Sequence, residues 1–212
     1  MSEVIRRAKP FVHRVVVVDG YSQDNTFETA WNAGADVIYQ DGDGKGMALR
    51  TAFEKLYADI YITIDGDATY DANEMGKIIQ PILDQEADMV VGSRLGGRME
   101  QGSISKINQI GNNLFNFLIN LFFGGEITDS QSGFRAFNRR VIDGLTLSSQ
   151  SFEVETELTI KTLLRGLKIK EVPISYCKRR GTPSKLSSLK AGSRILKTIF
   201  KSTLKNSKDG YI

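Results

Sequence analysis

Four short apolar segments, each followed by a polar loop, constrain the fold of this 212-residue chain more than any other feature. They are RVVVV (14–18), ADVIYQ (35–40), DIYITI (59–64) and ADMVVGS (87–93). Between them lie helical patterns over residues 25–33, 46–57 and 72–85. Strands that alternate with helices of this length indicate βαβ units. The sequence therefore predicts an α/β fold with a mostly parallel sheet flanked by helices.

The polar loops that follow these strands carry the most distinctive residues of the chain. They are DGYSQDNT, QDGDGKG, DGDATYD and GSRLGGR. Crossover connections between parallel strands are right-handed, so the loops after the strands meet at one edge of the sheet, where ligands bind in open α/β sheets. We therefore expect the binding chemistry at this carboxyl edge.

The second half of the chain departs from the regular alternation. We expect a helix over 103–123, then the segment DSQSGFRAFN (129–138) with no assigned element, a helix over 153–165, a strand KIKEVPISY (168–176) and an amphipathic helix over 189–204. On this basis the chain divides into a main domain, residues 1–187, and a basic amphipathic helix with its tail, residues 188–212.

The composition restricts the kinds of site that the chain can build. Hydrophobic residues make up 41% and charged residues 25%, which is ordinary for a soluble globular protein. Cys177 is the only cysteine and His13 the only histidine. The chain therefore forms no internal disulfide and has too few ligands for a zinc site. Any metal must be held by oxygen atoms, which suit Mg²⁺ or Mn²⁺.

The segment YITIDGDATYD (61–71) carries two carboxylates where a strand ends. Asp65 and Asp67 alternate in phase on an extended chain, so both side chains can face one cation. A divalent ion there could bridge the two phosphates of a nucleoside diphosphate and neutralise charge on a leaving group. An ordinary turn accounts for Asp and Gly as well. Both interpretations stay open at this point.

The loop QDGDGKG (40–46) resembles the start of a calcium-binding EF-hand loop, but its pattern fails. The fifth position is Lys45 and the twelfth is Ala52, where that loop needs a bidentate Glu. Its glycines recur every second residue, unlike those of a dinucleotide-binding GxGxxG loop. Lys45 is well placed to hold an anion at a helix N-terminus. A plain loop is the alternative.

Two arginines lie in turns rich in Gly and Ser: Arg94 in VGSR and Arg135 in DSQSGFR. With KRRGTPSK (178–185) they can form a phosphate clamp, because a guanidinium binds phosphate through two N–H groups. Surface salt bridges are the alternative for both arginines. Asp129 is either a counterion for one of them or a cap. The three acids of FEVETEL (152–158) suit a helix N-terminus, although a general base is also conceivable there.

The C-terminal quarter is strongly basic, although the net charge is only +3. Between residues 161 and 208 stand fourteen Lys and Arg against the single acid Glu171. Such a block suits phosphate, nucleic acid or an anionic membrane surface. A membrane span needs about 18 uninterrupted apolar residues. The nearest stretch, 110–125, is interrupted by four asparagines.

Seven segments, taken in order, resemble family 2 glycosyltransferases, and most closely the dolichyl-phosphate mannose and glucose synthase-like enzymes of archaea. They are VVVVDGYSQDNT, DGDGKGMALRTAF, YITIDGDATYD, VGSRL, DSQSGFRAFNRRVI, FEVETELTIKTLLRGLKIKEVPISY and KRRGTPSKLS, within about residues 3–200. The resemblance implies a GT-A fold and inverting transfer of a sugar from a nucleotide sugar to dolichyl or polyprenyl phosphate. It also implies Mg²⁺ or Mn²⁺ as cofactor and a role in protein glycosylation.

Carried over residue by residue, the resemblance assigns metal binding to Asp65 and Asp67. It assigns contact with the nucleotide to Asp19 and Lys45. It also implies a set of residues at the donor and acceptor phosphates: Arg94, Arg135, Arg179, Arg180 and Lys185. Asp65, Asp67, Arg94 and Arg135 form the expected catalytic set.

Three departures from the family pattern stand out. The family's Asp-Asp-Gly-Ser is Asp19-Gly20-Tyr21-Ser22 here, which leaves the identity of a base open. Thr69 stands where many mannose-phosphate synthases have a metal-binding Gln. MSEVIRRAKPF (1–11) matches the family's first helix, so we expect the family's first strand and its loop to be missing, with a start about twenty residues upstream.

The basic tail and the resemblance together predict a peripheral enzyme at the cytoplasmic face of the cell membrane. Its expected partners are a nucleotide sugar, polyprenyl phosphate and an anionic membrane surface, and not nucleic acid. A nucleotidyltransferase is one alternative, but no Gly-rich loop with Arg and Lys stands near the N-terminus. A nucleic-acid-binding module is another, but the basic stretch has few interleaved aromatic residues for stacking on bases.

Overall fold

The computed structural model describes residues 1–179 and 188–208. Within these ranges the strands form two sheets. In the first, β1 (Val16–Asp19) pairs in parallel with β2 (Asp36–Tyr39). The second has the order β3-β5-β4-β6, with β3 (Ile60–Thr63), β5 (Arg135–Asn138), β4 (Met89–Ser93) and β6 (Ile169–Pro173).

The α/β class is confirmed, but the strands form two sheets where one mostly parallel sheet was expected, and one strand runs antiparallel to its neighbours. The pair β4 and β6 is parallel, as the βαβ pattern predicts. However, β5 is antiparallel to both of its neighbours, β3 and β4. Its four residues RAFN come from a segment in which the sequence alone predicts no strand. A short strand with polar residues at both ends has no apolar alternation that would reveal it.

The expected helices are present in the expected order, with ends that differ by a few residues, and the four-residue α6 was not expected. They are α1 (Ser2–Ala8), η1 (Lys9–Phe11), α2 (Thr26–Asn32), α3 (Lys45–Lys55), η2 (Ala72–Glu74), α4 (Met75–Leu83), α5 (Lys106–Phe123), α6 (Arg139–Ile142), α7 (Val154–Leu164) and α8 (Ser188–Lys208). Capping residues explain where α5 begins and ends. The Ser105 side chain accepts a hydrogen bond from the Asn108 amide, and Gly124 closes the helix at a φ of 68°.

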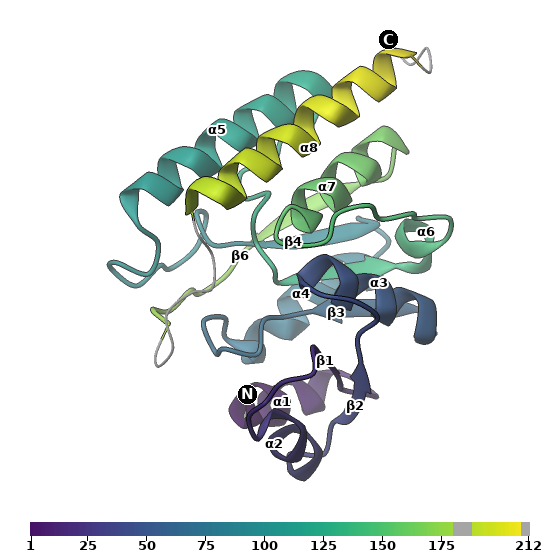
Figure 1. Cartoon of the computed structure of the whole chain (residues 1–212), viewed down its shortest axis with the longest axis vertical. Helices are drawn as coiled ribbons and strands as arrows, with labels where there is room; N and C mark the ends of the chain where they lie inside the picture. The colour runs from purple at the N-terminus through teal and green to yellow at the C-terminus, as the bar shows by residue number, and fades with distance from the viewer. Residues whose placement is uncertain (180–187, 209–212) are drawn as a thin grey trace.

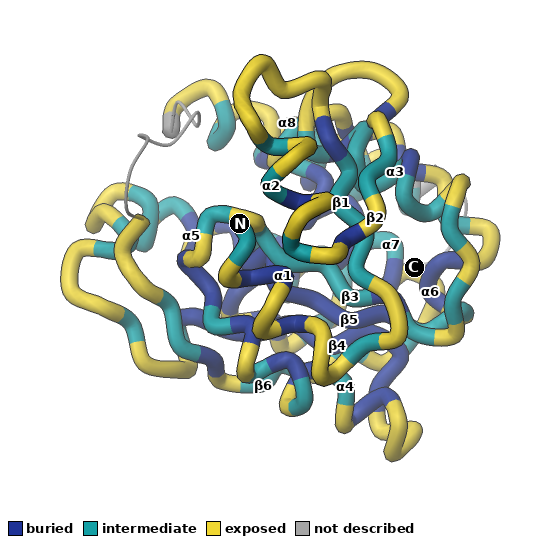
Figure 2. Tube along the Cα trace, turned by 90° about the horizontal axis from the view of Figure 1, so that it is seen from below, coloured by how far each residue is buried: buried dark blue, intermediate teal, exposed yellow. Residues whose placement is uncertain are grey.

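The four-stranded sheet is packed on both faces. Along β4, Val90 belongs to a core that includes Ile78 of α4, whereas Met89 and Val91 belong to a core on the other face that includes Leu158 of α7. This is the alternation of side chains expected of a strand. Figure 2 shows β4 and β5 deeply buried, whereas β1 and β2 lie nearer the surface.

The helices α5 and α8 form a separate layer outside α7. They lie side by side along one end of the molecule, opposite the end that carries α1, α2, β1 and β2 (Figure 1). Their shared core contains Phe115 and Ile119 of α5, Ile160 of α7, and Ile195 and Ile199 of α8. Two of the apolar residues of α8 are therefore internal and not available to a partner.

Candidate functional site

The loop after β3 is a turn, and its two carboxylates both face cations. Oδ1 of Asp67 accepts hydrogen bonds from the Thr69 amide (3.1 Å) and the Thr69 hydroxyl (2.7 Å). Ala68, at the tip, has a φ of 61°. The hydroxyl of the buried Thr69 is therefore committed to orienting Asp67. The two interpretations of this segment are compatible, because the turn is what holds the carboxylates in place.

Lys45 joins this loop to α7. Its Nζ lies 2.7 Å from Oδ1 of Asp65 and 2.7 Å from Oε1 of Glu155. Burial disfavours the charged ammonium, but Asp65 and Glu155 outweigh it and raise the pKa of Lys45 above its ordinary value. The other oxygen of Glu155 is buried without a hydrogen-bond partner among the described residues. The residues of FEVETEL that we assigned to a helix start thus include one that contacts the site.

Glycines let the Lys45 loop pack tightly against the segment before α7. The Gly46 amide donates to the carbonyl of Gln150 at 2.9 Å. A Cβ at Gly46 would lie 2.1 Å from the Ser149 carbonyl oxygen, and one at Gly44 would lie 2.3 Å from that of Gln150. Gly44 also has a φ of 96°, which favours glycine. The alternating glycines of QDGDGKG therefore have a packing role that places Lys45.

Arg179, in the segment that follows β6, is the fourth residue of the cluster. Its guanidinium forms an ion pair with Oδ2 of Asp67. Burial raises the pKa of Asp67, but the hydrogen bonds from Thr69 and the charge of Arg179 outweigh it and lower this pKa below its ordinary value. The structure thus brings together Lys45, Asp65, Asp67 and Arg179. Two more of the five predicted phosphate ligands, Arg180 and Lys185, lie outside the described residues.

Arg94 forms a buried ion pair with the predicted counterion. Its Nε and one terminal nitrogen lie 2.8 Å and 2.7 Å from the two oxygens of Asp129, and its backbone amide donates to Asp129 at 2.8 Å. The guanidinium also lies over the Tyr176 ring, 5.2 Å from its centroid. Burial opposes the charge of Arg94, but Tyr70 and Asp129 raise its pKa above the ordinary value. The pairing with Asp129 is confirmed, and it is buried, whereas we had considered a surface bridge.

Arg135 lies in the protein core, which differs from the phosphate contact expected of it. Its three guanidinium nitrogens donate to three groups: the carbonyls of Ser132 (2.7 Å) and Ser130 (2.6 Å), and the Thr159 hydroxyl (2.9 Å). Burial lowers the pKa of Arg135 below its ordinary value. Arg135 therefore supports the loop 130–133. That loop delivers Gly133, where an added Cβ would lie 2.7 Å from Nζ of Lys45.

Asp19 lies at the end of β1, in the other sheet. It is buried and accepts hydrogen bonds from the amide (3.1 Å) and hydroxyl (2.5 Å) of Ser22. Tyr21 between them has a φ of 57°, within a tight turn. None of the hydrogen bonds described for Asp19 reaches Lys45, Asp65 or Asp67. Its assignment to the nucleotide stays a prediction.

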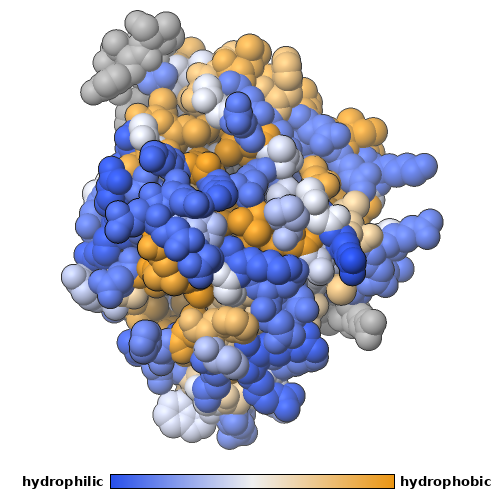
Figure 3. All heavy atoms as spheres, turned by 180° about the vertical axis from the view of Figure 1, so that it is seen from behind, coloured by the Kyte–Doolittle hydropathy of each residue, from blue (hydrophilic) through white to orange (hydrophobic). Residues whose placement is uncertain are grey.

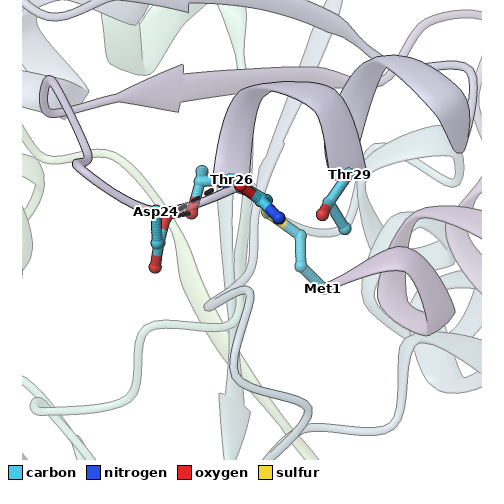
Figure 4. Close-up of a pocket in the computed structure, with 5 residues that line it drawn as sticks. Met1, Asp24, Thr26 and Thr29 are labelled. Carbon is cyan, nitrogen blue, oxygen red and sulfur yellow. Dashed lines mark hydrogen bonds between the residues drawn. The ribbon is translucent and has the colours of Figure 1, made fainter.

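A hollow lies beside the start of α2 (Figure 4). It is lined by Met1, Asp24, Asn25, Thr26 and Thr29. Oδ1 of Asp24 accepts hydrogen bonds from the amide and hydroxyl of Thr26. A Cβ at Gly66 would lie 3.7 Å from Cγ of Met1, so one wall of the hollow lies against the loop of Asp65 and Asp67.

The two carboxylates of the cluster suit a divalent metal ion, but they supply only part of the ligands that such an ion needs. Within residues 1–179 and 188–208, no group of three or more His, Cys, Asp or Glu could hold a metal. Asp65 and Asp67 supply hard oxygen ligands from one loop. A Mg²⁺ ion typically takes one or two protein carboxylates and completes its shell with substrate phosphates and water. The residues present fit that mode of binding.

The sequence matches the model of glycosyl transferase family 2 over residues 2–146. The chain belongs to glycosyl transferase family 2. Among its relatives, the glycosyltransferase AglJ of Haloferax volcanii is 36% identical over 88% of the chain and 62% of the relative. The dolichyl-phosphate hexose transferase of the same organism is 33% identical over 88% of the chain and 79% of the relative. The chain thus spans less than two thirds of AglJ.

The GT-A fold of this family 2 chain is shared with solved structures. Glucosyl-3-phosphoglycerate synthase from Mycobacterium tuberculosis, in complex with Mn²⁺, UDP and glucosyl-3-phosphoglycerate, superposes with a TM-score of 0.76. The match covers 95% of this chain and 74% of that one, at 23% identity. At this identity the likeness concerns the fold. No helix in the part of the family 2 chain that the structure describes has the length and apolar character to cross a membrane.

Proposed function

We propose that this family 2 glycosyltransferase transfers a sugar, with inversion, from a nucleotide sugar to dolichyl or another polyprenyl phosphate. The observation that carries the proposal is the cluster of Lys45, Asp65, Asp67 and Arg179, which combines two carboxylates with two cations. A relative with the name dolichyl-phosphate hexose transferase, matched over most of both chains, supports the lipid-phosphate acceptor. Family membership favours this activity over a nucleotidyltransferase or a nucleic-acid-binding module.

The proposed reaction needs alignment and positive charge more than it needs a general base. A phosphate monoester is already ionised near neutral pH, so its oxygen can attack the anomeric carbon directly. The bond from that carbon to the diphosphate oxygen of the donor breaks on the opposite face, which inverts the configuration. Oriented groups that hold both phosphates in line supply much of the rate enhancement in such a step.

The acids and the cations of the cluster have different roles in this step. Asp65 and Asp67 would hold Mg²⁺ or Mn²⁺, which supplies positive charge to the departing diphosphate. Lys45 and Arg179 lie beside these carboxylates and offer N–H donors to phosphate oxygens. Arg180 and Lys185 belong to the same proposed phosphate-binding segment as Arg179, whereas Arg94 and Arg135 act through the loops that they support.

The proposed location is the cytoplasmic face of the cell membrane, where a peripheral enzyme meets both a soluble donor and a lipid acceptor. Residues 1–187 would form the catalytic domain and residues 188–212 the basic helix and tail. The sugar would then serve protein glycosylation as a lipid-linked intermediate. GDP-mannose, UDP-glucose and UDP-N-acetylglucosamine are the candidate donors.

A transfer assay tests the proposal. Membranes that contain polyprenyl phosphate are incubated with the protein and each of the three radiolabelled nucleotide sugars, with Mg²⁺, Mn²⁺ or EDTA. We expect one donor to label the lipid fraction, and EDTA to abolish the labelling. Lack of lipid labelling with all three donors, from a protein that is folded by circular dichroism, would contradict the proposed acceptor.

A further inference from the structure

The helix α5 exposes a continuous apolar stripe. Five large apolar residues, spaced by three, four, three and four positions, are exposed by about half or more: Ile107 (68%), Ile110 (69%), Leu114 (48%), Phe117 (60%) and Leu121 (61%). This spacing places all five on one face of a helix. The opposite face, with Phe115 and Ile119, packs into the protein. The stripe is therefore a second apolar face, which the core does not use.

The neighbouring helix α8 continues this surface. Phe200 of α8 contacts Phe122 of α5, with ring centroids 6.2 Å apart. Exposed beside it on α8 are Leu189 and Leu204, at 84% and 67%. Figure 3 shows hydrophobic side chains gathered along the end of the molecule where α5 and α8 lie in Figure 1. The two helices together present an apolar surface larger than scattered single residues would give.

Basic residues flank the apolar surface, and neither helix contains an acid. The exposed cations are Lys106 on α5 and Lys190, Arg194, Lys197 and Lys201 on α8. Apolar side chains next to cations, without carboxylates, suit an anionic lipid surface. A second copy of the same surface would instead bring cations near cations with no acid on either helix to pair with them.

We propose that α5 and α8 together form a lipid-docking surface, and that the α5 stripe is the part that enters the headgroup region of an anionic bilayer. The sequence alone predicts membrane contact only by the basic C-terminal helix and tail. Because Ile195 and Ile199 of that helix are buried, α5 supplies most of the apolar contact. The role of α8 is chiefly electrostatic.

The position of this surface suits the proposed acceptor. A hollow begins at Leu95 and Gly96, directly after Arg94, and extends to Asn113 and Phe117 of α5. It therefore joins the loop after β4 to the apolar stripe. The relevance of docking to catalysis rests on the proposed function. The docking itself can be measured without any transfer of sugar.

Vesicle flotation tests the inference with the whole 212-residue chain. The vesicles are phosphatidylcholine alone or with 30% phosphatidylglycerol, about the anionic content that attracts polybasic surfaces. We expect binding to the mixed vesicles, at least about tenfold weaker in the double variant Ile110→Ser/Phe117→Ser. Leu83→Ser, which alters an exposed leucine of α4, is the matched control and should bind as the unaltered chain does. Lys197→Gln/Lys201→Gln should weaken binding to the mixed vesicles and leave any binding to pure phosphatidylcholine vesicles unchanged.

Two measurements distinguish insertion into lipid from association of two copies of the chain. In a Trp31→Phe background, the emission of Phe117→Trp should shift to the blue when mixed vesicles are added. Light scattering should show whether the same surface joins two copies. Unchanged vesicle binding by Ile110→Ser/Phe117→Ser, an unshifted emission, or a dimer that this variant abolishes would overturn the inference. Vesicle binding without lipid labelling would reject the proposed acceptor and leave the docking surface standing.

Discussion

Lys45 and Glu155 form an ion pair, 2.7 Å from Nζ to Oε1, between residues 110 positions apart in the sequence. The same ammonium lies 2.7 Å from Asp65, so one lysine connects the start of α3, the loop after β3 and the first turn of α7. Glu155 is buried, with its second oxygen lacking a hydrogen-bond partner in the described structure. The candidate site is thus organised around a cation that holds two carboxylates.

Lys45→Met should preserve the length of the side chain and remove its charge. The carboxylates of Asp65 and Glu155 would then lose their shared partner, which costs about 3–5 kcal/mol when a buried pair is broken. We expect a lower urea midpoint and at least a tenfold weaker nucleotide-sugar affinity, measured by calorimetry. Lys55→Met, which removes an exposed ion pair with Asp41, is the control. Equal affinity in Lys45→Met and the unaltered chain would contradict the role of Lys45.

Gly133→Ala should perturb the site while leaving the fold intact. The new Cβ would lie 2.7 Å from Nζ of Lys45 and 3.1 Å from a carboxylate oxygen of Asp65. Both are side-chain ends that can yield, so we expect little change in thermal stability but about a tenfold loss of nucleotide-sugar affinity. Gly111→Ala, inside α5, where the nearest atom lies 3.8 Å away, should leave the affinity unchanged and should not lower the stability. A large stability loss in Gly133→Ala without loss of affinity would show that this contact is purely structural.

Asp129→Asn should destabilise the protein strongly. Asp129 is fully buried, and its loss of charge would leave the Arg94 guanidinium without a counterion. Breaking such a pair costs about 3–5 kcal/mol, and high salt should not relieve it because the pair is shielded from solvent. Urea denaturation at low and high salt measures both effects. Asp36→Asn, which alters an exposed pair with Arg14, should change the midpoint little. Comparable effects of the two variants would contradict the account.

Glu157 should make stability depend on pH in acid. Burial raises its pKa, but Lys161 and the hydrogen bonds from Ser148 and Ser149 outweigh it and lower the pKa from 4.5 to about 2. A depressed carboxyl pKa stabilises the folded state above pH 4.5, and this contribution is lost as pH falls from 4.5 towards 2. The loss is up to about 3 kcal/mol. Urea midpoints of the unaltered chain should therefore fall more steeply over this window than those of Glu157→Gln. Parallel curves would contradict the prediction.

The sequence was sufficient for the parts of the fold that local pattern determines. The apolar runs before Asp19, Asp65 and Arg94 predicted three strands, because a buried strand needs such a run. The strand β5 was missed, since RAFN pairs only through β3 and β4, which come from earlier in the chain. Pairing of that kind is a property of the assembled sheet and leaves little local signal.

The candidate site was predictable in its carboxylates and in Lys45, because glycine-flanked charges after strands are visible in the sequence. The burial of Arg135 was not predictable. Its acceptors are the carbonyls of Ser130 and Ser132, and the direction of a carbonyl depends on the backbone conformation. Glu155 looked like an ordinary helix-start acid, because nothing nearby in the sequence indicates that Lys45 packs against it.

The most direct measurement of the central claim is lipid labelling by Asp67→Asn in the transfer assay, with the active donor and saturating Mn²⁺. Asn keeps an acceptor for the Thr69 amide and removes the charge that a metal and Arg179 require. The account predicts at least about a hundredfold loss of transfer with only a small fall in the thermal midpoint, while Asp84→Ala, at the end of α4, keeps full activity. Transfer by Asp67→Asn at a rate close to that of the unaltered chain would contradict it.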